Sequence, residues 1–281
     1  MPTIDLRSGT VHYTEAGPPD GRPVVCVHGY LMAGDLFAGL GERLAVRGLR
    51  CIMPTWPLGA HPEPMRTGAD LAPRGVAAII AEFLAALELE DVVLLGNDTG
   101  GALSQVVAVD HAERLGALVL TNCDLYENFP PGPFKALVPV AKIPGGLRVA
   151  LAPLRWGVAR RVVFGLLAHA DVDHLARGWI RPALADPRIF ADLRRFSVAM
   201  DAEMTLDAAR RLPGFAGPVL LAWAVDDRLL PLALAERLAA TLPDARLERI
   251  ADSRIFSMID QPDRLAELVA AFALRPAVAA D

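Results

Sequence analysis

The sequence has no long hydrophobic run: no stretch of its 281 residues approaches the roughly 18 consecutive apolar residues of a membrane-spanning helix. The segment from Met1 to Thr10 carries Asp5 and Arg7, where a secretory signal needs an apolar core. We therefore expect a cytoplasmic protein that has no membrane as a partner.

Cysteine is scarce as well. Cys26, Cys51 and Cys123 are an odd number, and no CxxC pair occurs. This excludes a disulfide framework and predicts three small buried hydrophobic side chains. Neither a Gly-Lys-Ser/Thr phosphate loop nor a GxGxxG turn is present, so we expect no nucleotide cofactor. We expect no metal either, because Asp171 stands where a zinc-binding run from His169 would need its second histidine, and no histidine follows residue 174.

Positive charge is in short supply outside one segment. The formal net charge is −5, and residues 125–213 hold 13 Lys and Arg against 8 Asp and Glu, so the remainder carries −10. Such a negative net charge on the residues outside this segment excludes nucleic acid as the main partner, because phosphate binding needs a cluster of positive charges. A small molecule is the expected partner.

The composition, 53% hydrophobic and 22% charged, is typical of a folded α/β protein. Short apolar runs alternate with longer stretches of helical spacing, which predicts a mostly parallel sheet flanked by helices. The expected strands are eight: 3–6, 10–16, 23–28, 49–53, 91–96, 115–122, 218–224 and 245–250. The expected helices of this core are 71–89, 103–109, 232–242 and 265–274.

The alternation stops between residues 125 and 213, where helical spacing continues without a strand. Helices are expected there at 146–156, 159–169, 171–180 and 187–200. We therefore predict a core domain of residues 1–124 and 214–281, with a helical cap domain of residues 125–213 inserted after the sixth strand. A chain of this length accommodates one large domain with an insertion.

The most informative segment joins the fifth strand to the helix after it. Asp98 stands there in the pattern Gly96-x-Asp98-x-Gly100, the spacing of a nucleophile elbow, where only glycine clears the backbone beside the exposed side chain. The turn His28-Gly29-Tyr30 follows another strand. The N–H groups of Tyr30 and Thr99 are expected to form an oxyanion hole beside Asp98.

With these motifs the sequence resembles the α/β-hydrolase superfamily over nearly its whole length. Further matches are the Asp227-to-Pro231 turn and the Asp260-Gln261-Pro262 run. Because the elbow carries Asp where esterases carry Ser, the nearest branch is that of epoxide hydrolases and haloalkane dehalogenases. This resemblance implies that Asp98 attacks an alkyl carbon and that a His-activated water then hydrolyses the ester.

Two acids could orient that histidine. Asp227 lies in the turn after the seventh strand, where most superfamily members have the acid. Asp124, at the end of the sixth strand, matches the position used by a group of dehalogenases. We favour Asp227, although either carboxylate could instead cap its own loop.

The histidine that should follow is missing, because all six histidines precede residue 175. Alignment with the usual Gly-His pair places Arg254 and Ile255 there, and an aliphatic side chain accepts no proton. Loss of a general base costs ~10² to 10⁴ in rate, so hydrolysis should be slow or stalled. Candidates for a substitute base are His28, His61, His169 and His174.

Other departures from the branch narrow the chemistry. Thr99 follows the nucleophile where dehalogenases carry a halide-holding Trp or Arg. Tyr126 is the one tyrosine in or near the cap, where epoxide hydrolases use two. The indole N–H of Trp156 or Trp179 is an alternative donor. Both dehalogenation and epoxide opening are therefore disfavoured in their usual forms.

Three hypotheses follow. Asp98 is a nucleophile acting on an epoxide, alkyl halide or activated ester; or it is an acid/base in an isomerase, lyase or cyclase; or the chain binds a small molecule without turnover, as hormone receptors of this fold do. The apolar cap predicts a largely apolar ligand, with Arg148 or Arg155 meeting any anionic group. The residues expected to supply the apolar surface are Leu147, Val149, Leu151, Leu154, Val162, Phe164 and Leu166. The resemblance also allows a homodimer.

Overall fold

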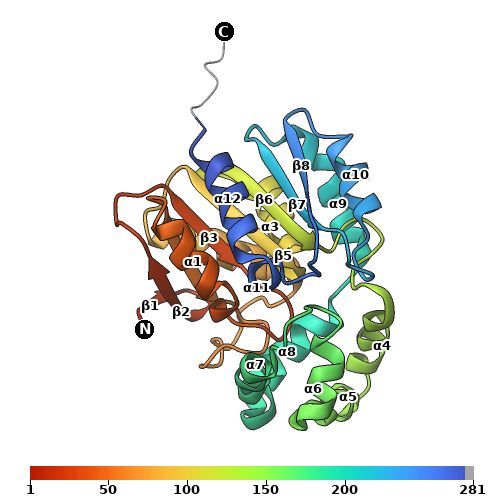
Figure 1. Cartoon of the computed structure of the whole chain (residues 1–281). Helices are drawn as coiled ribbons and strands as arrows, with labels where there is room; N and C mark the ends of the chain where they lie inside the picture. Colours follow the sequence, from red (N-terminus) through yellow and green to blue (C-terminus); the bar gives the residue numbers. More distant parts are fainter. Residues whose placement is uncertain (276–281) are drawn as a thin grey trace.

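A computed structural model describes residues 1–275 and contains an eight-stranded sheet (Figure 1). All eight predicted strands are present, with small shifts at their ends. Their bounds are β1 Thr3–Leu6, β2 Gly9–Ala16, β3 Pro23–Val27, β4 Arg50–Thr55, β5 Val92–Asp98, β6 Leu115–Cys123, β7 Val219–Ala224 and β8 Ala245–Ile250. The predicted mostly parallel sheet is confirmed: β1, β2 and β4 pair antiparallel, and every other pairing is parallel.

The strand order places the predicted motifs together. It runs β1-β2-β4-β3-β5-β6-β7-β8, so the chain direction across the sheet reverses between β3 and β5. In open α/β sheets ligands bind at the carboxyl ends of the strands beside such a reversal. The turn His28-Gly29-Tyr30 follows β3, and Asp98 ends β5, so both lie at this point.

Helices cover both faces of the sheet. Helix α1 lies on one face, where α12 packs against it, and α2, α3 and α10 lie on the other. Their bounds are α1 Ala38–Ala45, α2 Pro73–Ala86, α3 Thr99–Asp110, α10 Leu232–Ala239, α11 Ser257–Asp260 and α12 Pro262–Ala273. Among residues 1–275 no helix combines the length and the hydropathy needed to cross a bilayer.

The segment between β6 and β7 is helical, as expected. Its helices are α4 Leu137–Lys142, α5 Gly146–Leu151, α6 Gly157–Phe164, α7 Asp173–Ala185, α8 Pro187–Val198 and α9 Ala202–Arg211, with a 3₁₀ turn (η4, Ala152–Arg155) between α5 and α6. Figure 1 shows α4 to α8 below the sheet, while α9 lies beside it and packs against α3. We use "cap" for α4 to α8. The domain division at residues 125 and 213 stays a prediction.

The core is continuous from the sheet to its helices. All seven residues of β5 are buried, which agrees with its unbroken apolar run and its central place in the sheet. The three cysteines are buried and unpaired, as expected. A rigid, fully packed strand therefore carries Asp98 at its end.

Candidate active site

Asp98 lies at the junction of β5 and α3 in a strained backbone conformation. Its φ is 54° and its ψ −132°, which L-residues rarely adopt and which costs about 1–3 kcal/mol. The flanking glycines allow the chain to approach this closely. A Cβ on Gly100 would lie 2.1 Å from the carbonyl oxygen of Val27, and one on Gly96 2.5 Å from the Oγ of Ser104. The spacing of small residues around Asp98 thus has a steric cause.

The turn after β3 presses directly on the Asp98 carboxyl. A Cβ on Gly29 would lie 2.1 Å from Oδ2 of Asp98, so only glycine fits there. The backbone N–H groups of Thr99 and Tyr30 hydrogen-bond to this carboxyl and lower its pKa. The two groups expected to form an oxyanion hole therefore hydrogen-bond to the Asp98 carboxyl itself.

Burial nevertheless dominates the ionisation of Asp98. The side chain is 8% exposed, and its pKa is raised from 3.8 to about 7, with desolvation as the largest cause. The charge of Asp227 adds to the rise, and the hydrogen bonds from the two N–H groups offset only part of it. Asp98 therefore changes its charge near neutral pH.

This shift predicts how stability depends on pH. Between the unfolded and folded pKa values the native state holds a proton that the unfolded state has lost, so stability falls as pH rises from about 4 to about 7. The free energy of unfolding should therefore fall between pH 5 and pH 8, and we expect Asp98→Asn to make this fall smaller by about 2 to 3 kcal/mol. Urea unfolding at both pH values tests this, with the exposed Asp20→Asn as control. An equal pH dependence in both variants would refute it.

The two candidate acids are both buried near Asp98, but their partners differ. Asp124 accepts a hydrogen bond from the Thr99 hydroxyl at 3.1 Å, and its Oδ1 has no hydrogen-bond partner among residues 1–275. Burial and the charge of Asp98 raise its pKa well above the usual range. Asp227 accepts from the Asn122 amide (2.8 Å) and from the N–H groups of Leu229 (2.8 Å) and Leu230 (3.2 Å). Burial also raises the pKa of Asp227.

Two of the candidate bases, His28 and His61, are buried, and both ring nitrogens of each already take part in hydrogen bonds within the protein. His28 accepts a hydrogen bond from the Trp56 N–H at Nε2 (2.8 Å), so its Nδ1 donates to the Gly29 carbonyl (2.9 Å). Burial lowers its pKa to about 4, and the ring fixes the turn as a neutral imidazole. His61 accepts from the Gly59 N–H (3.3 Å) and donates to Asp192 of α8 (3.3 Å).

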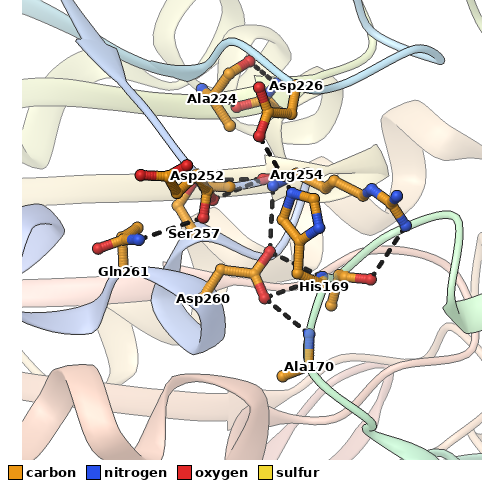
Figure 2. A network of polar contacts seen from close by, with 12 residues as sticks. His169, Ala170, Ala224, Asp226, Asp252, Arg254, Ser257, Asp260 and Gln261 are labelled. Carbon is orange, nitrogen blue, oxygen red and sulfur yellow. Dashed lines mark hydrogen bonds and ion pairs between the residues drawn. The ribbon is translucent and has the colours of Figure 1, made fainter.

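The other two lie outside the cavity. His174 is exposed on α7. His169 contacts Asp226 with Nε2 at 3.1 Å, on the polar network shown in Figure 2. In that network Asp260 accepts from the N–H groups of His169, Ala170 and Arg254. None of the four candidates lines the cavity beside Asp98.

Ile255 occupies a well-fixed position. Its carbonyl accepts from the Asn97 amide (2.8 Å), and the next residue, Phe256, donates its N–H to Leu167 of the cap segment (2.8 Å). The Ile255 side chain is fully buried and lines the same cavity as Asp98. An apolar surface thus faces Asp98 where the resemblance called for an imidazole.

A cavity of about 180 Å³ lies between the end of the sheet and the cap. From the core it is lined by Tyr30, Leu31, Met32, Asp98, Thr99, Leu229 and Ile255, and from the inserted segment by Pro131, Phe134, Leu137, Ala150, Leu151, Leu154, Val163, Phe164, Leu167 and Met200. Within the described residues it has no Lys, Arg or His in its wall. Gly29, Asp124 and Asp227 lie behind this wall rather than in it.

Several cap residues differ from expectation. Arg148, Arg155, Trp156, Trp179 and Tyr126 do not line the cavity, so the structure does not bring the expected anion contact or indole donors to it. Arg148 lies over the Phe190 ring, and the Trp179 indole donates to Asp35. Of the expected apolar residues Leu151, Leu154 and Phe164 line the cavity, Leu147 is buried elsewhere, and Val149, Val162 and Leu166 are exposed. Helical spacing alone could not distinguish the inner from the outer face.

Sequence reasoning missed the Tyr30 side chain, since only its N–H was considered. Its hydroxyl is 2.7 Å from the Ser197 hydroxyl, which itself donates to the Leu193 carbonyl at 2.7 Å. Tyr30 is therefore the donor to Ser197, and its oxygen can accept from a ligand. The Thr99 hydroxyl is used on Asp124, so Tyr30 and Asp98 are the side chains with polar capacity towards the cavity.

The chain matches the α/β-hydrolase fold family over residues 22–262 and belongs to it. Haloalkane dehalogenase 2 of Mycobacterium tuberculosis is 26% identical over 282 residues, covering 95% of this chain and 92% of the relative. A putative ancestral haloalkane dehalogenase superposes with a TM-score of 0.80 at 19% identity, over 97% of this chain and 98% of that one. An esterase of Thermogutta terrifontis reaches 0.76 at 19% identity, over 96% and 97%. The two solved structures establish the fold alone.

Proposed function

We propose that this protein is an enzyme of the Asp-nucleophile branch of its family, in which Asp98 attacks a small, largely apolar electrophile. The observation that supports this most directly is the Asp98 carboxyl itself. It lies at the wall of an apolar cavity, on a strained elbow, with backbone N–H groups on the carboxyl. The likeness to haloalkane dehalogenase 2 adds support for chemistry at an alkyl carbon.

The reaction is a displacement. One oxygen of ionised Asp98 forms a bond to an alkyl carbon, and the bond from that carbon to its leaving group breaks with the electron pair departing on the leaving group. The product is an alkyl ester of Asp98. The N–H groups of Thr99 and Tyr30 stay on the oxygen that does not attack, and they stabilise its partial charge throughout.

The second half-reaction lacks its usual catalyst. Water must attack the ester carbonyl and lose a proton, yet Ile255 stands at the expected base position and no described histidine lines the cavity. Without a general base this step is slower by ~10² to 10⁴. The ester should therefore accumulate.

The cavity favours a neutral substrate. No cationic side chain of residues 1–275 lines it, so an anionic group would lose its hydration without compensation. Its volume of about 180 Å³ fits a compact molecule. We expect neutral alkyl halides, epoxides and activated esters to bind better than their carboxylated analogues.

The test is intact-protein mass spectrometry after incubation with a panel of these electrophiles, followed by peptide mapping. We expect an adduct on the peptide that contains Asp98, forming faster as pH rises through about 7 because the carboxylate is the attacking form. The Asp98→Asn variant is the control and should form no adduct. Unmodified protein together with unchanged electrophiles would refute the proposal.

Acid/base chemistry at Asp98 is a second candidate, and one observation favours it: burial raises the pKa of Asp98 to about 7, which suits a group that takes up and returns a proton. An isomerase, lyase or cyclase would convert its substrate without a lasting adduct. Turnover by the unlabelled protein, abolished in Asp98→Asn, would select this alternative. Saturable binding with neither labelling nor turnover would instead select a binding protein.

A further inference from the structure

Large apolar side chains are exposed on one part of the cap. Ile143, Val149, Trp156, Val158, Val162 and Leu166 are between 45% and 74% exposed, and all lie within 24 consecutive residues. Val149 lies in α5, and Val158 and Val162 lie in α6, while Ile143, Trp156 and Leu166 lie next to the ends of α4 and α6. Helix α4 packs against α5, and the 3₁₀ turn η4 packs against both α5 and α6. Apolar side chains gathered in this way mark interaction sites. We call these six residues the outer face of the cap.

Helix α6 shows that this exposure is not a by-product of the cavity. Val158 and Val162 are four residues apart and therefore share one side of the helix. Val163 lines the cavity, while Phe164 and Arg160 are buried. The helix is thus apolar on its inner side, where the cavity accounts for it, and also on its outer side, which no described residue covers.

The same segment is uniformly basic. Residues 128–170 contain no Asp or Glu and six cations. Arg160 and Arg161 pair with Asp173 and Asp171, whereas Lys135, Lys142, Arg148 and Arg155 have no ion-pair partner among residues 1–275. The rest of the chain holds 22 Lys and Arg against 33 Asp and Glu, a net −11. Arg155 also lies over the ring of the exposed Trp156, 5.7 Å from its centroid. Basic residues beside exposed Trp and aliphatic side chains are the composition of surfaces that lie on anionic membranes.

We propose that the outer face of the cap docks onto an anionic lipid surface. A second copy of the chain is the less favourable occupant, because a two-fold interface would bring this basic segment against itself. The proposal departs from the expectation of no membrane partner. That expectation rested on the absence of a spanning segment, whereas the exposure of the α6 valines is visible only in the folded chain.

The location also connects the surface to the cavity. Ala150 and Val163 line the cavity, and their chain neighbours Val149 and Val162 belong to the outer face. One layer of helices therefore separates a docked lipid surface from the Asp98 cavity, which shortens the path of a molecule that partitions into lipid. Docking itself does not depend on the reaction proposed for Asp98.

Vesicle sedimentation tests the proposal with the full chain. Vesicles of phosphatidylcholine mixed with phosphatidylserine should sediment the protein, whereas phosphatidylcholine alone should sediment much less, and added salt should weaken the binding. The triple variant V158S/V162S/L166S should lose about tenfold or more of the affinity. The matched control V46S/V225S/L274S changes the same residue types, exposed but outside the cap, and should bind like the parent protein.

Three outcomes would overturn the proposal: no sedimentation with anionic vesicles, equal loss in both triple variants, or equal binding to both vesicle types. Analytical ultracentrifugation tests for a fourth outcome that would overturn it. A dimer that V158S/V162S/L166S dissociates and the control does not would assign the outer face to a second copy. All six substituted positions are solvent-exposed, so both variants should melt like the parent protein. Circular dichroism melting checks this and excludes unfolding as the cause of a binding loss.

Discussion

Replacing Ile255 with histidine is expected to shorten the lifetime of the Asp98 ester by ~10² to 10⁴, the usual contribution of a general base. The position suits an imidazole because the Ile255 side chain lines the cavity. The backbone there is fixed by two hydrogen bonds, from the Asn97 amide to the Ile255 carbonyl and from the Phe256 N–H to the Leu167 carbonyl. Asp227 lies close enough to Arg254 to feel its charge, and its Oδ2, which accepts from Asn122, can accept a further hydrogen bond. The imidazole takes a proton from water, and the resulting hydroxide cleaves the ester.

The measurement is the decay of adduct mass after excess electrophile is removed. Ile255→Leu keeps the apolar volume and should leave the decay unchanged. Adding Asp227→Asn to Ile255→His should undo most of the gain, because the acid orients the ring. Equal decay in the histidine and leucine variants, with unchanged melting temperatures, would show that the absence of a base is not what slows hydrolysis of the ester.

The second large effect is expected from Gly29→Ala. Its Cβ would lie 2.1 Å from Oδ2 and 2.7 Å from Cβ of Asp98, so the carboxyl must move. A displacement of about 1 Å in a reacting group can cost 10²-fold in rate, and we expect a loss of labelling rate of about that size. The substitution should also destabilise the fold, because Asp98 sits in a packed wall.

The matched control is Gly178→Ala. Gly178 is exposed within α7, and nothing lies within 4 Å of the Cβ that it would gain. Alanine there should stabilise the helix by about 0.5 to 1 kcal/mol and leave the labelling rate unchanged. Labelling of Gly29→Ala at the parental rate would mean that the His28-Gly29-Tyr30 turn does not position Asp98.

Much of the fold was predictable because its signals are local. Eight short apolar runs correspond to β1 to β8, and the glycines around Asp98 mark a turn with a steric requirement. Helices α1, α4, α9 and α11 were missed. In α9, Asp201 caps the helix by accepting from the Glu203 N–H at 3.0 Å, but only Met204, Thr205, Ala208 and Ala209 are buried, so the apolar pattern is weak.

The site was less predictable because it depends on tertiary contacts. That Asp98, Thr99, Tyr30 and Ile255 share one cavity required the strand order, in which β3 lies beside β5. The hydrogen-bond partners of the two buried histidines lie up to 131 positions away in the chain. His28 bonds to Trp56 and Gly29, and His61 bonds to Gly59 and Asp192. No spacing along the chain encodes such partners. The outward direction of Val149, Val162 and Leu166 likewise followed only from the packing of the cap.

The carboxylate of Asp260 has a mechanical consequence. It accepts the N–H groups of His169 and Ala170 after α6, and of Arg254 before Ile255, so one charged side chain ties the cap segment to the loop after β8 (Figure 2). Bonds of this kind contribute about 1.5–3 kcal/mol each. The loop that places Ile255 in the cavity wall is therefore held at a fixed distance from the cap segment that supplies Leu167 to the same wall.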